Sequence, residues 1–354
     1  MGRESTRKNA NELVVGRDEH QGELLELNRH PNSKPTFELK MGVATREAYG
    51  QALVELGKAN PNVVVLDADL AKSTFSAKFQ KEFPERFFTV GIAEANMVSI
   101  ASGLALSGKL PFASSFAVFL CDKGYDQLCM CAAYPRVNAK YVGSHGGISI
   151  GEDGPSQQAV EDYALMCALA GFVVLSPSDE FCARALVHRM AEHDGPVYMR
   201  TGRPKAPIIY GPNDTFEIGK AKQHGSGRDV AIIACGMEVG YALQAQAQLA
   251  DEGIQTRVLD MHTIKPVDEA AVAQATEECG AIVTAEEHLL DGGLGSQVAR
   301  AVAKSRPAPM EFVGIQNTYA ESATPDQLME KYGLTAPFIV KAVKAVLKRK
   351  NSRG

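Results

Sequence analysis

The sequence predicts an α/β protein made of two parallel-sheet domains, on three observations. Strand-like and helix-like patterns alternate from Val43 onward, which is typical of parallel sheets covered by helices on both faces. The alternation is interrupted at residues 204–228, where prolines and glycines gather and indicate a domain boundary. The chain has 354 residues, more than one ordinary domain and enough for two. We expect a polar leader over residues 1–37, a first domain over 38–205, a linker over 206–227 and a second domain over 228–350.

The leader is the least structured part of this prediction. Residues 1–36 are polar, with their few apolar residues gathered mainly in Leu13–Val15 and Leu24–Leu27. Such a composition favours a flexible segment, and a short docking segment for a partner is the alternative.

The first domain is predicted from a regular succession of periods. Thr45–Lys58 has helical spacing, and the valine-rich run Asn62–Leu66 indicates a short buried strand. Glu94–Gly108 is apolar nearly all round and rich in small residues, which predicts a buried, closely packed helix. The remaining elements are extended Pro111–Ala117, helix Lys123–Ala133, strand Val137–Val142, helix Val160–Ala170, strand Val173–Ser176, helix Asp179–His193 and strand Val197–Arg200.

The second domain repeats the same alternation. Its predicted elements are strand Asp229–Ala234, helix Glu238–Glu252, strand Thr256–Asp260, helix Asp268–Cys279, strand Ala281–Glu286, helix Leu294–Ser305 and a last helix, Ala336–Lys348.

Composition excludes several classes of protein. Hydrophobic residues make up 45% and charged residues 22%, as in globular proteins. No apolar stretch reaches the length of a membrane-spanning helix, and the N-terminus lacks the apolar core of a secretory signal. A net charge of −5 gives no reason to expect binding to nucleic acid or an anionic membrane. The seven cysteines form no CxxC pair, so a structural zinc site is not expected. We expect a soluble, cytoplasmic protein.

Chemistry is expected at the carboxyl ends of the strands, where ligands bind to parallel sheets. Four segments fall at such ends: Asp67–Ser76, Val90–Met97, Gly143–Gln158 and Arg200–Pro204. The last of them carries arginines that could fork onto an anion. No phosphate-cradling glycine loop, nucleophile elbow or HExxH motif is present.

Three residue patterns in these segments invite both a structural and a functional interpretation. Asp67 and Asp69 could hold a metal ion, but two carboxylates without a third ligand more often cap a loop, so we expect no metal. Glu94 enters an apolar helix, where a buried carboxylate needs either a partner or the helix dipole. His145 lies in a long glycine-dense loop after a strand, which favours a functional loop with the histidine exposed to a cleft.

These segments, in this order, resemble the C-terminal half of transketolases, from about Val43 to Lys348. The resemblance is greatest to the animal-type branch. It rests on Ala44-Thr-Arg-Glu-Ala-Tyr-Gly-Gln-Ala-Leu53, Ser144-His-Gly-Gly-Ile-Ser-Ile-Gly-Glu-Asp-Gly-Pro-Ser-Gln157 and Arg200-Thr-Gly-Arg-Pro204. It implies a thiamine diphosphate pyrimidine-binding domain followed by a transketolase C-terminal domain.

The resemblance also implies roles toward the cofactor, thiamine diphosphate. Glu94 matches the glutamate that contacts N1′ of the aminopyrimidine, where a shared proton favours the 4′-imino tautomer that removes the C2 proton. Phe116 and Phe119 match positions that pack on the pyrimidine ring. Asp69 matches a carboxylate near the cofactor.

Substrate residues are implied in the same way. Arg46, Ser73, His145 and Arg203 match positions that bind the sugar phosphate, and His145 is also a catalytic residue. Asp153 and Gln157 match positions that hold substrate hydroxyls. Many bacterial members have histidine where this chain has Gln157; glutamine keeps hydrogen bonding there but removes a titratable group.

No segment of this sequence resembles the upstream transketolase domain that binds the diphosphate through Mg²⁺ or Ca²⁺. We therefore expect the smaller subunit of a split transketolase, which shares the cofactor with a separate pyrophosphate-binding subunit that carries the metal. Its substrates would be sugar phosphates, and it would self-associate. Three alternatives remain open: the β subunit of a 2-oxoacid dehydrogenase, a deoxyxylulose phosphate synthase-like enzyme, and a non-catalytic regulatory half.

Overall fold

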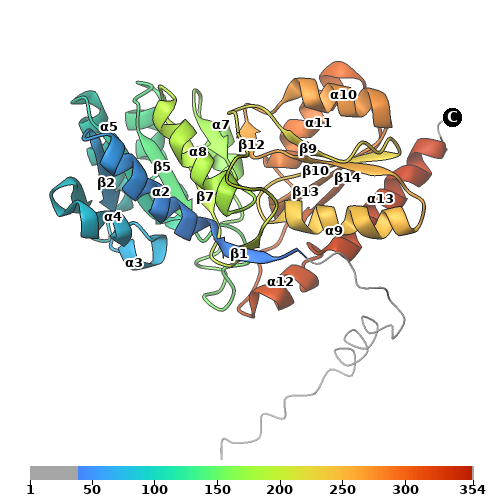
Figure 1. The fold of residues 1–354 in the computed structure, drawn as a ribbon, viewed down its shortest axis with the longest axis horizontal. Coiled ribbons are helices and arrows are strands. Elements are labelled where there is room, and N and C mark those ends of the chain that lie inside the picture. The colour runs from blue at the N-terminus through green and yellow to red at the C-terminus, as the bar shows by residue number, and fades with distance from the viewer. Residues whose placement is uncertain (1–38, 353–354) are drawn as a thin grey trace, which may run out of the picture. The chain divides into compact units, whose positions relative to one another are not determined.

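The computed structural model describes residues 39–352, so the leader predicted over residues 1–37 lies outside the described residues. The described chain forms two large sheets flanked by helices (Figure 1). Every pairing between strands predicted from the sequence is parallel. The predicted α/β class with two parallel-dominated sheets is confirmed. Within residues 39–352, no helix has both the length and the apolar character needed to cross a lipid bilayer.

The first sheet has seven strands among the described residues, six of which precede residue 205. In spatial order they are β12 (Thr263–Lys265), β6 (Val173–Leu175), β7 (Val197–Thr201), β5 (Lys140–Ser144), β4 (Leu110–Phe116), β2 (Val63–Asp67) and β3 (Phe87–Thr89). Only β12 runs antiparallel to its neighbour. Because β12 belongs to the second half of the sequence, this strand ties the two halves together.

Helices cover both faces of this sheet. One apolar cluster joins α2 (Thr45–Ala59) and α8 (Glu180–Glu192) to one face. The other face is covered by α5 (Glu94–Leu106) and α7 (Asp162–Ala168). Smaller helices complete this half: α3 (Ala71–Thr74), α4 (Ala77–Glu82), η1 (Pro84–Arg86), η2 (Phe119–Lys123), α6 (Tyr125–Gln127) and η3 (Leu128–Ala133).

The second sheet has five strands in the order β14 (Met310–Ile315), β13 (Ile282–Leu289), β10 (Val230–Ala234), β11 (Thr256–Asp260) and β9 (Lys222–His224). Only β9 is antiparallel. Helices α9 (Glu238–Asp251) and α13 (Ala336–Asn351) pack in one apolar cluster, while α10 (Glu269–Cys279) and α11 (Leu294–Ser305) pack in the other. Helix α12 (Pro325–Lys331) and a two-stranded sheet of β1 (Met41–Ala44) with β8 (Lys205–Pro207) complete the fold.

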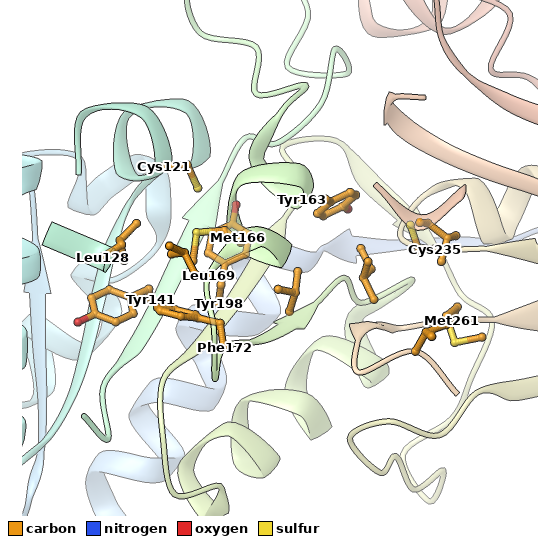
Figure 2. Close-up of a cluster of buried hydrophobic side chains, with 14 of the residues drawn as sticks. Cys121, Leu128, Tyr141, Tyr163, Met166, Leu169, Phe172, Tyr198, Cys235 and Met261 are labelled. Atoms are coloured by element: carbon orange, nitrogen blue, oxygen red, sulfur yellow. The ribbon is translucent and has the colours of Figure 1, made fainter. Parts of the chain in front are cut away.

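A single apolar cluster runs from the first sheet into the second. Figure 2 shows part of it, with Tyr141 and Tyr198 from the first sheet and Cys235 and Met261 from the ends of strands in the second. The segment predicted as a linker, residues 206–227, also carries β9 and buries Tyr210 and Phe216. The two sheets therefore share a continuous core.

Two secondary-structure predictions differ from the structure. The single helix predicted over Lys123–Ala133 is replaced by two π-helical stretches, η2 and η3, joined by the short α6. The apolar spacing in the sequence does not distinguish an α-helix from these wider turns. Six strands were not predicted. Five of them, β1, β3, β8, β9 and β12, have only three or four residues, too few to establish a period. The sixth, β14, has six residues and was missed as well.

Candidate active site

The predicted site residues follow neighbouring strands of the first sheet. Glu94 follows β3, Asp69 follows β2, Phe116 ends β4, His145 follows β5 and Arg203 follows β7. These five strands are adjacent and parallel in the order β7-β5-β4-β2-β3. Because the carboxyl ends of parallel strands share one edge, the five residues are distributed along the same edge of the sheet.

His145 occupies the middle of this edge and has a left-handed backbone, with φ of 61°, which is uncommon for a residue other than glycine. Its Nε2 lies 3.1 Å from Nη1 of Arg46, and its Nδ1 lies 2.8 Å from the hydroxyl of Ser144. Since arginine can only donate, Nε2 accepts and Nδ1 carries the proton. The imidazole also stacks on Phe116, with ring centroids 3.8 Å apart.

The surroundings of His145 keep it neutral. Burial, followed by the positive charges of Arg46 and Arg203, lowers the pKa of His145 to about 3. Only 3% of the residue is exposed, so the expectation of an exposed histidine is wrong. The side chain is covered by the phenylalanine and arginine that pack against it, which the sequence places far away.

Arg46, near the start of α2, joins this group from a distant part of the chain. Its Nη1 donates to the backbone carbonyl of Ser73 at 2.7 Å, and the guanidinium lies 5.2 Å from the centre of the Phe75 ring. Its Nε is buried and has no hydrogen-bond partner among the described residues. Burial and the neighbouring Arg203 lower the pKa of Arg46. Arg46, Ser73 and His145 are therefore in contact.

Arg203 lies close enough to lower the pKa of both His145 and Arg46, but its own hydrogen bonds go to the loop after β5. Its Nη1 donates to the carbonyl of Ile150 and to Oε2 of Glu152, the latter at 3.1 Å. Asp153 in that loop is exposed and Gln157 is half-buried. Within residues 39–352, no hydrogen bond joins the side chains of Asp153 or Gln157 to the rest of the predicted site.

Glu94 begins helix α5 and is 3% exposed. Its Oε1 is buried and finds no hydrogen-bond partner in the part of the chain that the structure describes. A buried carboxylate oxygen without a partner is costly. Along the carboxyl edge of the sheet, Glu94 lies at one end of the row of five predicted site residues and Arg203 at the other. A ligand with a hydrogen-bond donor would satisfy the free oxygen of Glu94.

The aromatic residues predicted to pack on the cofactor lie together. Phe116 and Phe119 stack nearly parallel, with an interplanar angle of 10° and ring centroids 5.7 Å apart. Phe119 begins the π-helical stretch η2, and the ammonium group of Lys123 lies 4.6 Å from the centre of its ring. These rings offer an apolar surface at the end of β4.

The two aspartates after β2 differ in environment. Asp67 is fully buried and accepts hydrogen bonds from the Leu70 amide and from the hydroxyls of Thr74 and Ser76, at 2.6 to 2.9 Å. Burial raises the pKa of Asp67 to about 6. Asp69 is exposed, with a φ of 68°. Asp67 thus caps its loop. Among residues 39–352, no three or more metal-ligating side chains lie close enough together to hold a metal ion.

A buried ion pair behind this edge was not predicted. Arg200, in β7, donates from Nε and Nη2 to both carboxylate oxygens of Asp162, at 2.9 and 2.6 Å, and Tyr198 donates to the same carboxylate at 2.7 Å. The guanidinium also lies over the Tyr163 ring, 4.0 Å from its centre. An arginine of this segment does fork onto an anion, but the anion is an internal carboxylate. No local sequence signal connects residues 38 positions apart.

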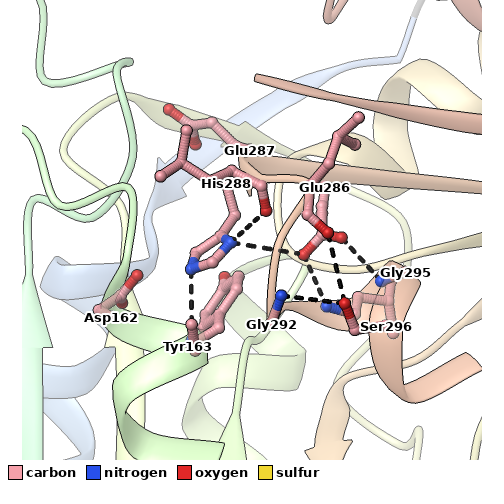
Figure 3. A network of polar contacts seen from close by, with 12 residues as sticks. Asp162, Tyr163, Glu286, Glu287, His288, Gly292, Gly295 and Ser296 are labelled. Carbon is pink, nitrogen blue, oxygen red and sulfur yellow. Dashed lines mark hydrogen bonds and ion pairs between the residues drawn. The ribbon is translucent and has the colours of Figure 1, made fainter. Parts of the chain in front are cut away.

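The second domain contributes adjacent charged residues to the same region (Figure 3). Glu286, in β13, accepts from the amides of Leu294 and Gly295 at 2.6 and 2.7 Å and so caps helix α11. Burial raises the pKa of Glu286 to about 7. His288 stacks on Tyr163 with ring centroids 5.1 Å apart. His288 also accepts from the Ala164 amide at 3.3 Å, so it forms a contact between the two domains, whereas the bonds of Glu286 stay within the second domain.

Two family models match this chain. The model of the transketolase pyrimidine-binding domain matches residues 41–208, and that of the transketolase C-terminal domain matches residues 219–339. The first match contains all the site residues predicted above.

Similar proteins include separate sections and full-length enzymes. The chain is 42% identical to a putative transketolase C-terminal section of Methanocaldococcus jannaschii, over 86% of this chain and 96% of that protein. It is 41% identical to a 6-deoxy-6-sulfo-D-fructose transketolase subunit of a Clostridium species, over 87% and 96% respectively. Human transketolase is 40% identical over 89% of this chain, which spans 51% of that longer protein.

A solved structure has the same fold. It is described as a split gene transketolase in an inactive β4 tetramer, and it is 47% identical, with a TM-score of 0.83. The match covers 87% of this chain and 100% of that one. The chain belongs to the transketolase family.

Proposed function

We propose that this chain is the C-terminal subunit of a thiamine diphosphate-dependent transketolase. Together with a separate pyrophosphate-binding subunit, it transfers a two-carbon ketol unit from a ketose phosphate to an aldose phosphate. The relatives that are themselves separate sections or split-gene chains support the division, because this chain covers 96% to 100% of each. Pentose phosphates are the expected substrates.

The observation that carries the proposal is Oε1 of Glu94, which is buried and has no hydrogen-bond partner among residues 39–352. It fits the aminopyrimidine, whose protonated N1′ is a donor, and the stacked rings of Phe116 and Phe119 supply apolar cover for a flat heterocycle. When bound, the cofactor supplies the carbanion chemistry of ketol transfer. Glu94 holds the proton at N1′. The diphosphate and its Mg²⁺ or Ca²⁺ belong to the partner subunit.

The cations at the other end of the row fit the phosphate of a sugar. Arg46, His145 and Arg203 lie close enough that the two arginines lower the pKa of the histidine, and Arg203 lowers that of Arg46. A dianionic phosphate would relieve this repulsion and give the buried Nε of Arg46 a partner. On binding, the phosphate would compete with His145 for Arg46, leaving Nε2 of the imidazole free to accept from a substrate hydroxyl.

An exposed apolar face supports association through α5. Ile100 and Leu106 on α5, Met130 and Tyr134 at η3, and Ile92 ahead of α5 are 37% to 83% exposed. Helix α5 packs against η3, and large apolar groups exposed on neighbouring elements are typical of protein interfaces. A subunit that covers this face would also lie close to Glu94, which begins the same helix, so self-association and completion of the active site would be coupled.

Reconstitution tests the proposal. The purified chain is mixed with the cognate pyrophosphate-binding subunit, thiamine diphosphate and Mg²⁺, and ketol transfer from xylulose 5-phosphate to ribose 5-phosphate is measured. We expect neither subunit to act alone and the mixture to be active. Robust turnover by the pure chain alone, or oxidative decarboxylation of a 2-oxoacid by the mixture in place of ketol transfer, would contradict the proposal.

A further inference from the structure

The loop that carries the predicted substrate residues is fastened to the second domain. This loop, residues 145–159 between β5 and α7, is called the substrate loop below. It contains His145, Asp153 and Gln157, and the Ile150 carbonyl accepts from Arg203. Ile148, Ser149 and Ile150 have no exposed surface, and Ile148 packs in the apolar cluster of the second domain.

The loop's own backbone bonds close its base and three turns. Two of these turns are closed by the Gly154 amide on the Gly151 carbonyl and by the Gln157 amide on the Gly154 carbonyl, at 3.1 and 3.0 Å. The Gly147 amide donates to the Ala159 carbonyl at 2.7 Å, and the Gly151 amide donates to the Ile148 carbonyl at 3.0 Å. The Gly146 amide donates to the Thr201 carbonyl at 3.3 Å. These bonds leave the Ser149 amide to be satisfied from elsewhere.

Glu287, in β13 of the second domain, supplies the acceptor for the Ser149 amide. The Ser149 amide donates to Oε1 of Glu287 at 2.5 Å, across 138 positions of sequence. Gly147 has a φ of 79°, and a Cβ on it would overlap the Glu287 carboxylate. Only glycine allows the loop to approach this closely.

Arg200 links the end of the loop at Ala159 to the backbone of Glu287. Its Nη1 donates to the backbone carbonyl of Glu287 at 2.8 Å, and its Nη2 donates to the carbonyl of Ala159 at 2.6 Å. The Glu287 side chain therefore bonds the loop at Ser149, and Arg200 links the loop's end at Ala159 to the Glu287 backbone.

We propose that Glu287 is a positioning residue of the active site: it holds the substrate loop in place from the second domain and so sets the affinity for sugar phosphates. The predicted effect on the affinity for sugar phosphates rests on the proposed function. Glu287 thus gives the C-terminal domain a role in substrate binding without contact with substrate. Figure 3 shows that the neighbouring Glu286 points in a different direction, into its own domain, and it caps α11.

This pair of adjacent glutamates provides a matched experiment in the reconstituted enzyme. In Glu287→Ala the Ser149 amide loses its acceptor, so we expect the KM for the ketose phosphate to rise about 10-fold, the lower range for a charged hydrogen bond, with kcat changed less than about threefold. Glu287→Gln keeps an acceptor oxygen and should restore most of the affinity. Glu286→Ala removes an equally buried carboxylate and should lower stability with KM unchanged.

Hydrogen exchange of the isolated chain gives a second readout that does not depend on activity. We expect Glu287→Ala to increase exchange at amides 147–151, and Glu286→Ala to increase it at the start of α11 instead. Should Glu287→Ala fail to fold, Gly147→Ala breaks the same contact from the loop side and should raise KM in the same way.

The outcomes separate the two proposals. An unchanged KM and unchanged exchange at 147–151 in Glu287→Ala would overturn the positioning role, as would equal effects from Glu286→Ala. If the wild-type pair transfers no ketol group, the proposed function fails, and the exchange measurement alone decides whether Glu287 holds the loop.

Discussion

Replacement of Asp162 by asparagine tests how much the buried ion pair behind the active site stabilises the fold. Asp162 and Arg200 form an ion pair whose side chains are only 1% and 5% exposed. Asparagine has the same shape but no charge, and its amide would face donors from Arg200 and Tyr198. The guanidinium would remain buried without a counter-charge.

The expected cost follows from this burial. Removal of one partner from a buried ion pair typically costs about 3–5 kcal/mol, a large share of a total stability of about 5–15 kcal/mol. By contrast, the pair of Lys304 with Glu269, 59% and 47% exposed, should contribute at most about 1 kcal/mol. The difference between the two pairs comes from solvent screening of the exposed one.

Urea denaturation, followed by circular dichroism, measures both effects. Asp162→Asn should lower the free energy of unfolding by several times the change produced by the control, Glu269→Gln. If the two variants lose equal amounts of unfolding free energy, each about 1 kcal/mol or less, burial does not make the Asp162–Arg200 pair more stabilising than an exposed one.

Two further predictions concern phosphate recognition and pH. Arg203→Ala should lower kcat/KM about 10- to 150-fold for a phosphorylated acceptor and much less for glycolaldehyde, whereas an equal fall on both would mean that Arg203 supports the fold. Glu152→Gln, which removes the arginine's surface partner, is the control and should not weaken the phosphorylated acceptor. Burial lowers the pKa of His288 to about 4, so between about pH 6.5 and 4 the unfolded chain binds a proton at this residue and the folded chain does not. The free energy of unfolding should therefore fall as the pH drops through this range, by up to about 1.4 kcal/mol per pH unit. Denaturation of His288→Gln over this range should show a shallower slope than wild type, and identical slopes would refute this role for His288.

The sequence predicted those parts of the fold and site that depend on local patterns. Alternating periods gave both parallel sheets, and the rule that parallel strands share a carboxyl edge grouped the segments of Glu94, His145 and Arg203. The interpretation of Asp67 and Asp69 as loop-capping groups was confirmed for Asp67. This was predictable because the groups that donate to its carboxylate lie within nine positions along the chain.

The features of the site that were not predicted depend on contacts between distant residues. His145 is buried because Arg46, 99 positions away, and Phe116 cover it. Strand β12 pairs with β6 of the first sheet, and Glu287 bonds the Ser149 amide of the substrate loop. Both contacts join residues from the two halves of the chain. No period within a short window reports such contacts.

Glu94 is the residue on which the proposed function depends most directly. Glu94→Gln keeps the size of the side chain and removes the carboxylate that would hold the proton at N1′. The measurement is the rate of ketol transfer by the reconstituted pair at saturating cofactor, after assembly of the variant pair has been checked. Loss of general acid–base function costs about 10²- to 10⁴-fold, and we predict a fall in that range. A rate close to that of wild type would contradict the account and leave Glu94 as a residue that only begins helix α5.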